Sequence, residues 1–164
     1  MTYLEGFVNI LNSDLLLGGR ILPGEAGCGP VAIKGSYIVV KIDSDSFKQK
    51  VINTIYQSGQ VRCISDYIVV SDRIILVCEM KSNNENNMKV QLRNTGKFIK
   101  YLISIVQQHA SPTMLEPSLK YVCFANSYVN KQTTKGNKLD SISWSEGELF
   151  RLPCNASYHL NQFI

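Results

Sequence analysis

Two consecutive apolar runs, separated by three polar residues, constrain the fold of this chain more than any other feature. The first run is Cys63–Val70 and the second is Ile74–Lys81, with Ser71–Arg73 between them. Short apolar runs rich in valine and isoleucine, joined by a polar turn, predict two adjacent strands of a buried β-hairpin. The chain is therefore expected to fold around a sheet that contains this hairpin.

Three charged residues lie inside these apolar runs: Asp66 in the first, and Glu79 and Lys81 in the second. Side chains alternate along a strand, so Glu79 and Lys81 point to the same face. A tight turn at Asp72–Arg73 would place Asp66 directly opposite Glu79, with β-carbons about 5 Å apart. Like charges in facing positions destabilise a hairpin unless something compensates, and a divalent cation with oxygen ligands would do so.

The chemistry that suits two carboxylates and a lysine on one patch of sheet is phosphodiester hydrolysis. Carboxylates can hold Mg²⁺ or Mn²⁺ beside the scissile phosphate, and the lysine can orient water or neutralise developing charge. The other interpretation is a surface hairpin whose carboxylates are simply solvated. The face that carries Glu79 and Lys81 also carries Ile75 and Val77, which favours a buried row over a wet one.

Other segments complete the predicted order of elements. The pattern predicts a helix or strand at 1–12, strands at 36–42, 120–125 and 148–153, and helices at 47–57 and 89–108. Residues 13–35 are predicted to form a glycine-rich loop region. The fold class is α/β: a single domain over residues 1–164, with a central mixed β-sheet flanked by helices and a core at about 36–153.

Composition limits the classes of protein further. The chain has 164 residues, 45% of them apolar, and a net charge of +4, which permits an anionic partner without requiring one. No apolar stretch approaches the roughly 20 residues that span a bilayer, and the N-terminus lacks a secretory signal, so a cytoplasmic location without membrane contact is predicted. The five cysteines are odd in number and not closely spaced, which predicts unpaired structural cysteines.

The spacing of the charged residues resembles a known nuclease motif. Asp66, twelve intervening residues and then Glu79-Met80-Lys81 are similar to the signature of the PD-(D/E)XK nuclease superfamily, which has the restriction endonuclease-like fold. The resemblance covers about residues 46–127 and is nearest to small members such as archaeal Holliday-junction resolvases. It implies that Asp66, Glu79 and the backbone carbonyl of Met80 bind the metal, that Lys81 is catalytic, and that Gln91 assists.

The same resemblance implies a Mg²⁺- or Mn²⁺-dependent endonuclease that hydrolyses DNA in restriction, defence, or recombination and repair. Two positions depart from the family pattern. Ser65 precedes the first acid where proline is common, and the predicted helix at 47–57 lacks the glutamate that many members carry. Glu5 could supply that acid only if the N-terminal segment forms the relevant helix, so a single bound ion is favoured.

Basic residues and a glycine-rich segment offer further candidate contacts with DNA. A stripe on the predicted second helix could bind phosphates or could be an ordinary solvated face: Lys89, Arg93, Lys97 and Lys100. Gly24–Pro30 lacks the ending of a phosphate-binding loop, so it is interpreted as a structural loop or one near bound DNA. The remaining alternatives are a catalytically silent nuclease-fold subunit that binds nucleic acid or protein, and an unrelated α/β interaction domain. Cleavage of both duplex strands would favour a homodimer.

Overall fold

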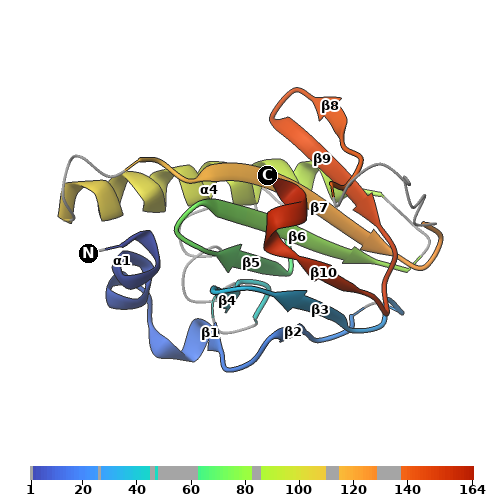
Figure 1. Cartoon of the computed structure of the whole chain (residues 1–164), viewed down its shortest axis with the longest axis horizontal. Coiled ribbons are helices and arrows are strands. Elements are labelled where there is room, and N and C mark those ends of the chain that lie inside the picture. The colour runs from blue at the N-terminus through green and yellow to red at the C-terminus, as the bar shows by residue number, and fades with distance from the viewer. Residues whose placement is uncertain are drawn as a thin grey trace.

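The computed structural model of the chain describes residues 2–25, 27–44, 47, 63–82, 86–109, 115–128 and 138–164. Within these residues the helices, 3₁₀-helices and strands are, in order, α1 (Tyr3–Ile10), η1 (Ser13–Leu15), β1 (Leu16–Leu17), β2 (Ile21–Leu22), β3 (Val31–Lys34), β4 (Ile38–Lys41), β5 (Tyr67–Val70), β6 (Ile74–Lys81), α4 (Met88–His109), β7 (Ser118–Ala125), β8 (Ile142–Trp144), β9 (Gly147–Leu152), β10 (Ser157–His159) and η3 (Leu160–Phe163) (Figure 1).

The fold is α/β and is built on a large mixed sheet, as the sequence predicted. Among the described residues, seven strands form this sheet in the order β1-β4-β5-β6-β7-β9-β8. The neighbours β6 and β7 are parallel, as are β7 and β9, whereas β5 runs antiparallel to both β4 and β6. A second sheet has the order β10-β3-β2. The long α4 connects the parallel strands β6 and β7, as a crossover of this kind requires.

The large sheet separates two apolar clusters of buried residues. On one face, Ile68, Val77 and Tyr121 pack against α1 and α4, with Phe7 and Leu92 among the helix residues. On the other face, the second sheet and η3 supply the covering side chains: Leu22, Val31, Ile33, Tyr158, Leu160 and Phe163. Strands β5 and β6 are therefore buried on both faces, which explains their continuous apolar sequence. The buried core extends beyond residues 36–153 at both ends.

Most of the predicted elements are confirmed. The hairpin forms β5 and β6, the long helix is α4, and the strands predicted at 36–42, 120–125 and 148–153 are β4, β7 and β9. The N-terminal segment is a helix, and Thr2 and Glu5 cap it reciprocally. The helix predicted at 47–57 lies outside the described residues, except for Phe47, which is buried.

The segment 13–35 is more structured than the loop region expected from its glycines. It contains η1 and the strands β1, β2 and β3. Strands β1 and β2 have two residues each, which is too short for a repeating pattern in the sequence. They are held by pairing with β4 and β3, which are themselves parts of larger sheets.

Gly96, which lies within α4, has a packing role in the structure. A β-carbon at this position would collide with the ring of Tyr121 on β7. Glycine therefore allows α4 to approach the sheet closely at this point. No helix among the described residues has both the length and the apolar character needed to span a membrane.

Candidate metal centre

The hairpin has the register that the sequence predicted. Strands β5 and β6 pair with Tyr67 opposite Cys78 and Val70 opposite Ile75. One further step outward would set Asp66 opposite Glu79. The ladder begins at Tyr67, however, so Asp66 lies one residue before it, and its Oδ2 accepts a hydrogen bond of 2.6 Å from the backbone N–H of Met80.

Glu79 is a buried carboxylate with one unsatisfied oxygen. The residue is 1% exposed and lies near the end of β6, on the face that Val77 shares with α4. Its Oε1 pairs with Lys81 Nζ at 2.7 Å. Its Oε2 is buried and accepts no hydrogen bond from any residue that the structure describes. Buried polar atoms are usually satisfied, so this oxygen marks a place where a ligand would find a partner.

Gln91 joins this group from the beginning of α4. Its Oε1 accepts a hydrogen bond of 2.7 Å from Lys81 Nζ, and its Nε2 donates to the carbonyl of Ile64 at 3.2 Å. The structure thus brings Glu79, Lys81 and Gln91 into one connected group, and Ile64 lies two residues before Asp66. This is the neighbourhood that the family resemblance implied for these side chains.

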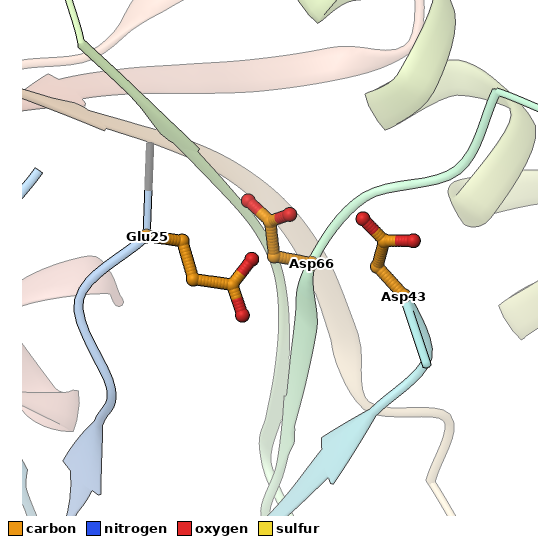
Figure 2. A group of neighbouring side chains, drawn as sticks. All are labelled: Glu25, Asp43 and Asp66. Carbon is orange, nitrogen blue, oxygen red and sulfur yellow. The ribbon is translucent and has the colours of Figure 1, made fainter. Parts of the chain in front are cut away.

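Two further carboxylates, which the sequence interpretation missed, lie beside Asp66. One oxygen each of Glu25, Asp43 and Asp66 lie within 4.8 Å of one another (Figure 2). Glu25 comes from the loop between β2 and β3, and Asp43 follows β4, the strand that neighbours β5. Asp43 could have been found, because it is an acid directly after the strand predicted at 36–42.

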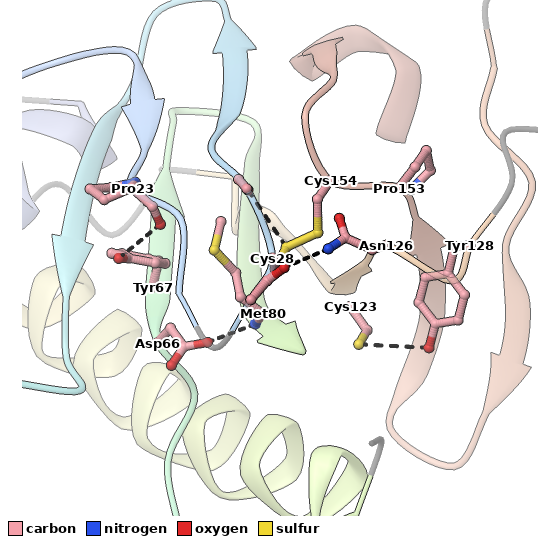
Figure 3. The surroundings of a disulfide bond; sticks show 12 residues. Pro23, Cys28, Asp66, Tyr67, Met80, Cys123, Asn126, Tyr128, Pro153 and Cys154 are labelled. Atoms are coloured by element: carbon pink, nitrogen blue, oxygen red, sulfur yellow. Dashed lines mark hydrogen bonds between the residues drawn. A yellow bond between two sulfur atoms is a disulfide. The ribbon is translucent and has the colours of Figure 1, made fainter. Parts of the chain in front are cut away.

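The Glu25 carboxylate is held by two donors. Its Oε1 accepts from the hydroxyl of Tyr67 at 2.5 Å and pairs with Lys41 Nζ at 2.9 Å. The same loop is fixed by a disulfide between Cys28 and Cys154, which is shown with its surroundings in Figure 3.

The disulfide corrects the prediction that all cysteines are unpaired. Cys28 and Cys154 form a disulfide across 126 positions of the sequence, whereas Cys63, Cys78 and Cys123 keep their thiol groups. Spacing along the chain could not reveal the pair, because the fold brings the loop after β2 next to the end of β9. Disulfides persist mainly outside the reducing cytosol, so this pair does not support the predicted cytoplasmic location, which stays a prediction.

Burial and mutual repulsion set the charges of the carboxylates. Burial, together with the neighbouring Glu25 charge, raises the pKa of Asp66 to about 6, although the hydrogen bond from Met80 opposes the rise. Burial and then the charge of Asp66 raise the pKa of Glu79 to about 8, against the effect of Lys81. Burial would also raise the pKa of Glu25, but hydrogen bonds from Tyr67 and Lys41 outweigh it and the pKa lies below its ordinary value. The fold therefore maintains two carboxylates, Asp66 and Glu79, whose charged forms are unfavourable here.

Two groups of residues are not brought to this site in the way the sequence suggested. Glu5 caps α1, and the adjacent Leu4 N–H donates to Asp72 in the turn of the hairpin, at the end away from Asp66. In the basic stripe of α4, Lys89, Lys97 and Lys100 are exposed, but Arg93 Nε pairs with Glu146 Oε1 at 3.1 Å.

Comparisons of this chain with protein-family models, with curated proteins and with solved structures found no match.

Proposed function

We propose that this protein is a metal-dependent endonuclease that hydrolyses DNA phosphodiester bonds, of the kind that the PD-(D/E)XK resemblance implies. The observation that carries the proposal is the buried Glu79 carboxylate. One of its oxygens pairs with Lys81, the other has no partner in the described structure, and Asp66, one residue before the ladder, accepts a hydrogen bond from the N–H of the adjacent Met80. Burying a carboxylate oxygen that has no partner costs stability, so a ligand is the better explanation.

A divalent cation fits the donor set at this place. Asp66, Glu79 and the backbone carbonyl of Met80 would hold it, and the Glu25 and Asp43 carboxylates beside Asp66 add oxygen donors of the type that Mg²⁺ and Mn²⁺ prefer. A bound Mg²⁺ or Mn²⁺ polarises a phosphoryl oxygen and lowers the pKa of a coordinated water. The additional acids leave room for more than the single ion favoured by the sequence.

Lys81 and Gln91 have complementary roles in the proposal. The Lys81 ammonium stabilises negative charge that develops on the phosphate during hydrolysis. Gln91 accepts a hydrogen bond from Lys81 Nζ and so fixes the direction of the lysine side chain. Lysine at this position acts as a point charge, which is why its placement by a second residue matters.

DNA is proposed as the substrate because of the charge on α4 and on the whole chain. Lys89 lies in the first turn of α4, close to Gln91, and Lys97 and Lys100 are exposed further along the helix. These side chains are suited to contact phosphates without reading sequence. Arg93 contributes less, because its guanidinium is engaged by Glu146.

A catalytically silent nuclease-fold subunit is the second candidate. Several members of the site already have internal partners: Glu79 pairs with Lys81, Glu25 pairs with Lys41, and Asp66 accepts from the Met80 N–H. Such pairing could fill the site without a metal. A silent subunit would bind nucleic acid or a protein partner through the same surface.

The two candidates are separated by a cleavage assay. Plasmid, linear and branched DNA are incubated with the protein in Mg²⁺, Mn²⁺ or EDTA, beside Lys81→Ala and Asp66→Asn, with Lys34→Ala as a matched control. Lys34 is an exposed lysine that lines a cleft with Asp72 and Arg73 at the opposite end of the hairpin. The proposal expects metal-dependent cleavage by the wild type and Lys34→Ala only. Cleavage that survives both site variants would exclude this site as its source.

A further inference from the structure

The backbone immediately before Asp66 is held by three side chains of α4. Asn94 Nδ2 donates to the carbonyl of Cys63 at 2.9 Å, and Gln91 Nε2 donates to the carbonyl of Ile64 at 3.2 Å. Thr95 Oγ1 accepts from the N–H of Ser65 at 2.8 Å. Because helix positions 91, 94 and 95 lie on one face, three consecutive residues of the strand entrance are fixed by one side of α4.

The bond to Thr95 is the most deeply buried of the three. Ser65 and Thr95 are both 0% exposed. A buried N–H without a partner is costly, so loss of the threonine hydroxyl should destabilise this segment. The family resemblance has proline at this position, which has no N–H to satisfy. The serine of this chain therefore has a backbone N–H, and the hydroxyl oxygen of Thr95 accepts its hydrogen bond.

These bonds matter for Asp66 because the β-ladder does not include it. Strand β5 begins at Tyr67. The Asp66 carbonyl accepts a hydrogen bond of 3.2 Å from the N–H of Ile42, the residue that follows β4. The backbone of Asp66 is therefore held by the end of β4, and the residues before it are held by α4. The direction of the Asp66 carboxylate is thus set by both elements.

Gln91 links the same contacts to the lysine of the site. One end of its amide accepts from Lys81 Nζ, and the other donates to Ile64. A displacement of α4 relative to the hairpin would move the Asp66 segment and the Lys81 ammonium together.

We propose that Asn94 and Thr95 are positioning residues that fix the Asp66 carboxylate for metal binding and hydrolysis, and that α4 couples this placement to Lys81 through Gln91. The inference rests on the proposed function for its effect on metal binding, but not for the contacts themselves. Removing a residue that orients a metal ligand without binding the metal itself typically weakens metal affinity ten- to a hundredfold.

The test compares Thr95→Val, Thr95→Ser and Asn94→Ala with Ile99→Val. Ile99 is 0% exposed on the next turn of α4, and this substitution removes one methylene while leaving the three hydrogen bonds to residues 63–65 in place. Mn²⁺ affinity is measured by calorimetry, and kcat and KM for DNA are measured at saturating Mn²⁺. Thr95→Val and Asn94→Ala are each expected to weaken Mn²⁺ binding about tenfold or more and to lower kcat with KM little changed. Thr95→Ser, which keeps the hydroxyl group, should retain the Mn²⁺ affinity and the kcat of the wild type.

Two outcomes separate this inference from the proposed function. Equal losses in Thr95→Val and Ile99→Val, or no rescue by serine, would overturn the positioning role while leaving the metal site intact. If the wild type binds no Mn²⁺, the proposed function and the metal-dependent part of this inference both fail, and hydrogen exchange of the Ser65 amide then tests whether Thr95 holds the segment before Asp66. Exchange should be faster in Thr95→Val than in Ile99→Val, and equal exchange in the two variants would overturn the contact. Asn94, which is half-buried, provides the second variant if Thr95→Val does not fold.

Discussion

Asp66→Asn should make the metal-free protein more stable, although it removes a proposed metal ligand. Asp66 is 5% exposed, and its carboxylate lies beside those of Glu25 and Asp43. The oxygen of asparagine can still accept from the Met80 N–H. The substitution therefore removes a repelled, buried charge and keeps the main hydrogen bond.

The size of the effect follows from the pKa of Asp66. Its rise from an ordinary value of 3.8 to about 6 corresponds to about 3 kcal/mol of unfavourable free energy for the ionised form in the folded state. Burial of the new amide group offsets part of this gain. We expect a net increase of about 1–3 kcal/mol in the free energy of unfolding at pH 8, or roughly 3–9 °C in Tm for a chain of this size.

The difference between the two proteins should depend on pH. The folded state holds the Asp66 proton more tightly than the unfolded state, so wild-type stability contributed by this group is complete below about pH 4 and is lost as the pH rises through about 6. The advantage of Asp66→Asn should accordingly be small near pH 4 and reach its full value above pH 7.

Denaturant unfolding in EDTA at several pH values measures this effect, with Asp140→Asn as an exposed control for the same chemical change. Mn²⁺ should reverse the order, because a ligand at a thousandfold excess over its Kd adds about 4.1 kcal/mol to the wild type alone. A less stable Asp66→Asn in EDTA at pH 8 would refute the reasoning, since it would mean that the carboxylate supports the fold.

A thiol titration of the denatured protein should find three thiols without reductant and five after reduction, and five thiols without reductant would disprove the Cys28–Cys154 pair. Reduction of the disulfide should also lower the free energy of unfolding by roughly 4–5 kcal/mol. Glu5→Ala removes half of the capping box of α1 and should cost about 1 kcal/mol in thermal unfolding, while calorimetry should find Mn²⁺ affinity unchanged; weaker Mn²⁺ binding would place Glu5 at the site after all. Replacing Lys97 and Lys100 together by glutamine should weaken DNA binding and reduce the slope of log K against log salt by about 2, whereas an unchanged slope would assign these lysines to a solvated face.

The hairpin and the elements after it could be predicted because their signals are local. Continuous runs of valine and isoleucine predicted strands that the structure shows to be buried on both faces, and apolar residues at helical spacing predicted α4. The register of β5 and β6 followed from the short turn and from the alternation of side chains. Together these placed Glu79 and Lys81 on the same face and Asp66 at the start of the neighbouring strand.

The rest of the site could not be predicted because it depends on contacts between distant segments. Glu25 reaches Asp66 only because the second sheet and the disulfide hold its loop against the large sheet. Nothing near Arg93 in the sequence indicates that Glu146 would engage it. The bond from Ser65 to Thr95 likewise spans 30 positions, and its value appears only once both residues are known to be buried.

Mn²⁺ binding to wild type and to Glu79→Gln tests the central claim most directly. Calorimetric titration at pH 8, with the exposed Glu116→Gln as control, should show saturable binding to the wild type and to the control. Glu79→Gln keeps the size of the side chain but removes the charge of the buried carboxylate, so its Mn²⁺ affinity should fall at least tenfold. Equal Mn²⁺ affinity in all three proteins, or no binding to the wild type, would contradict a metal centre at Asp66 and Glu79.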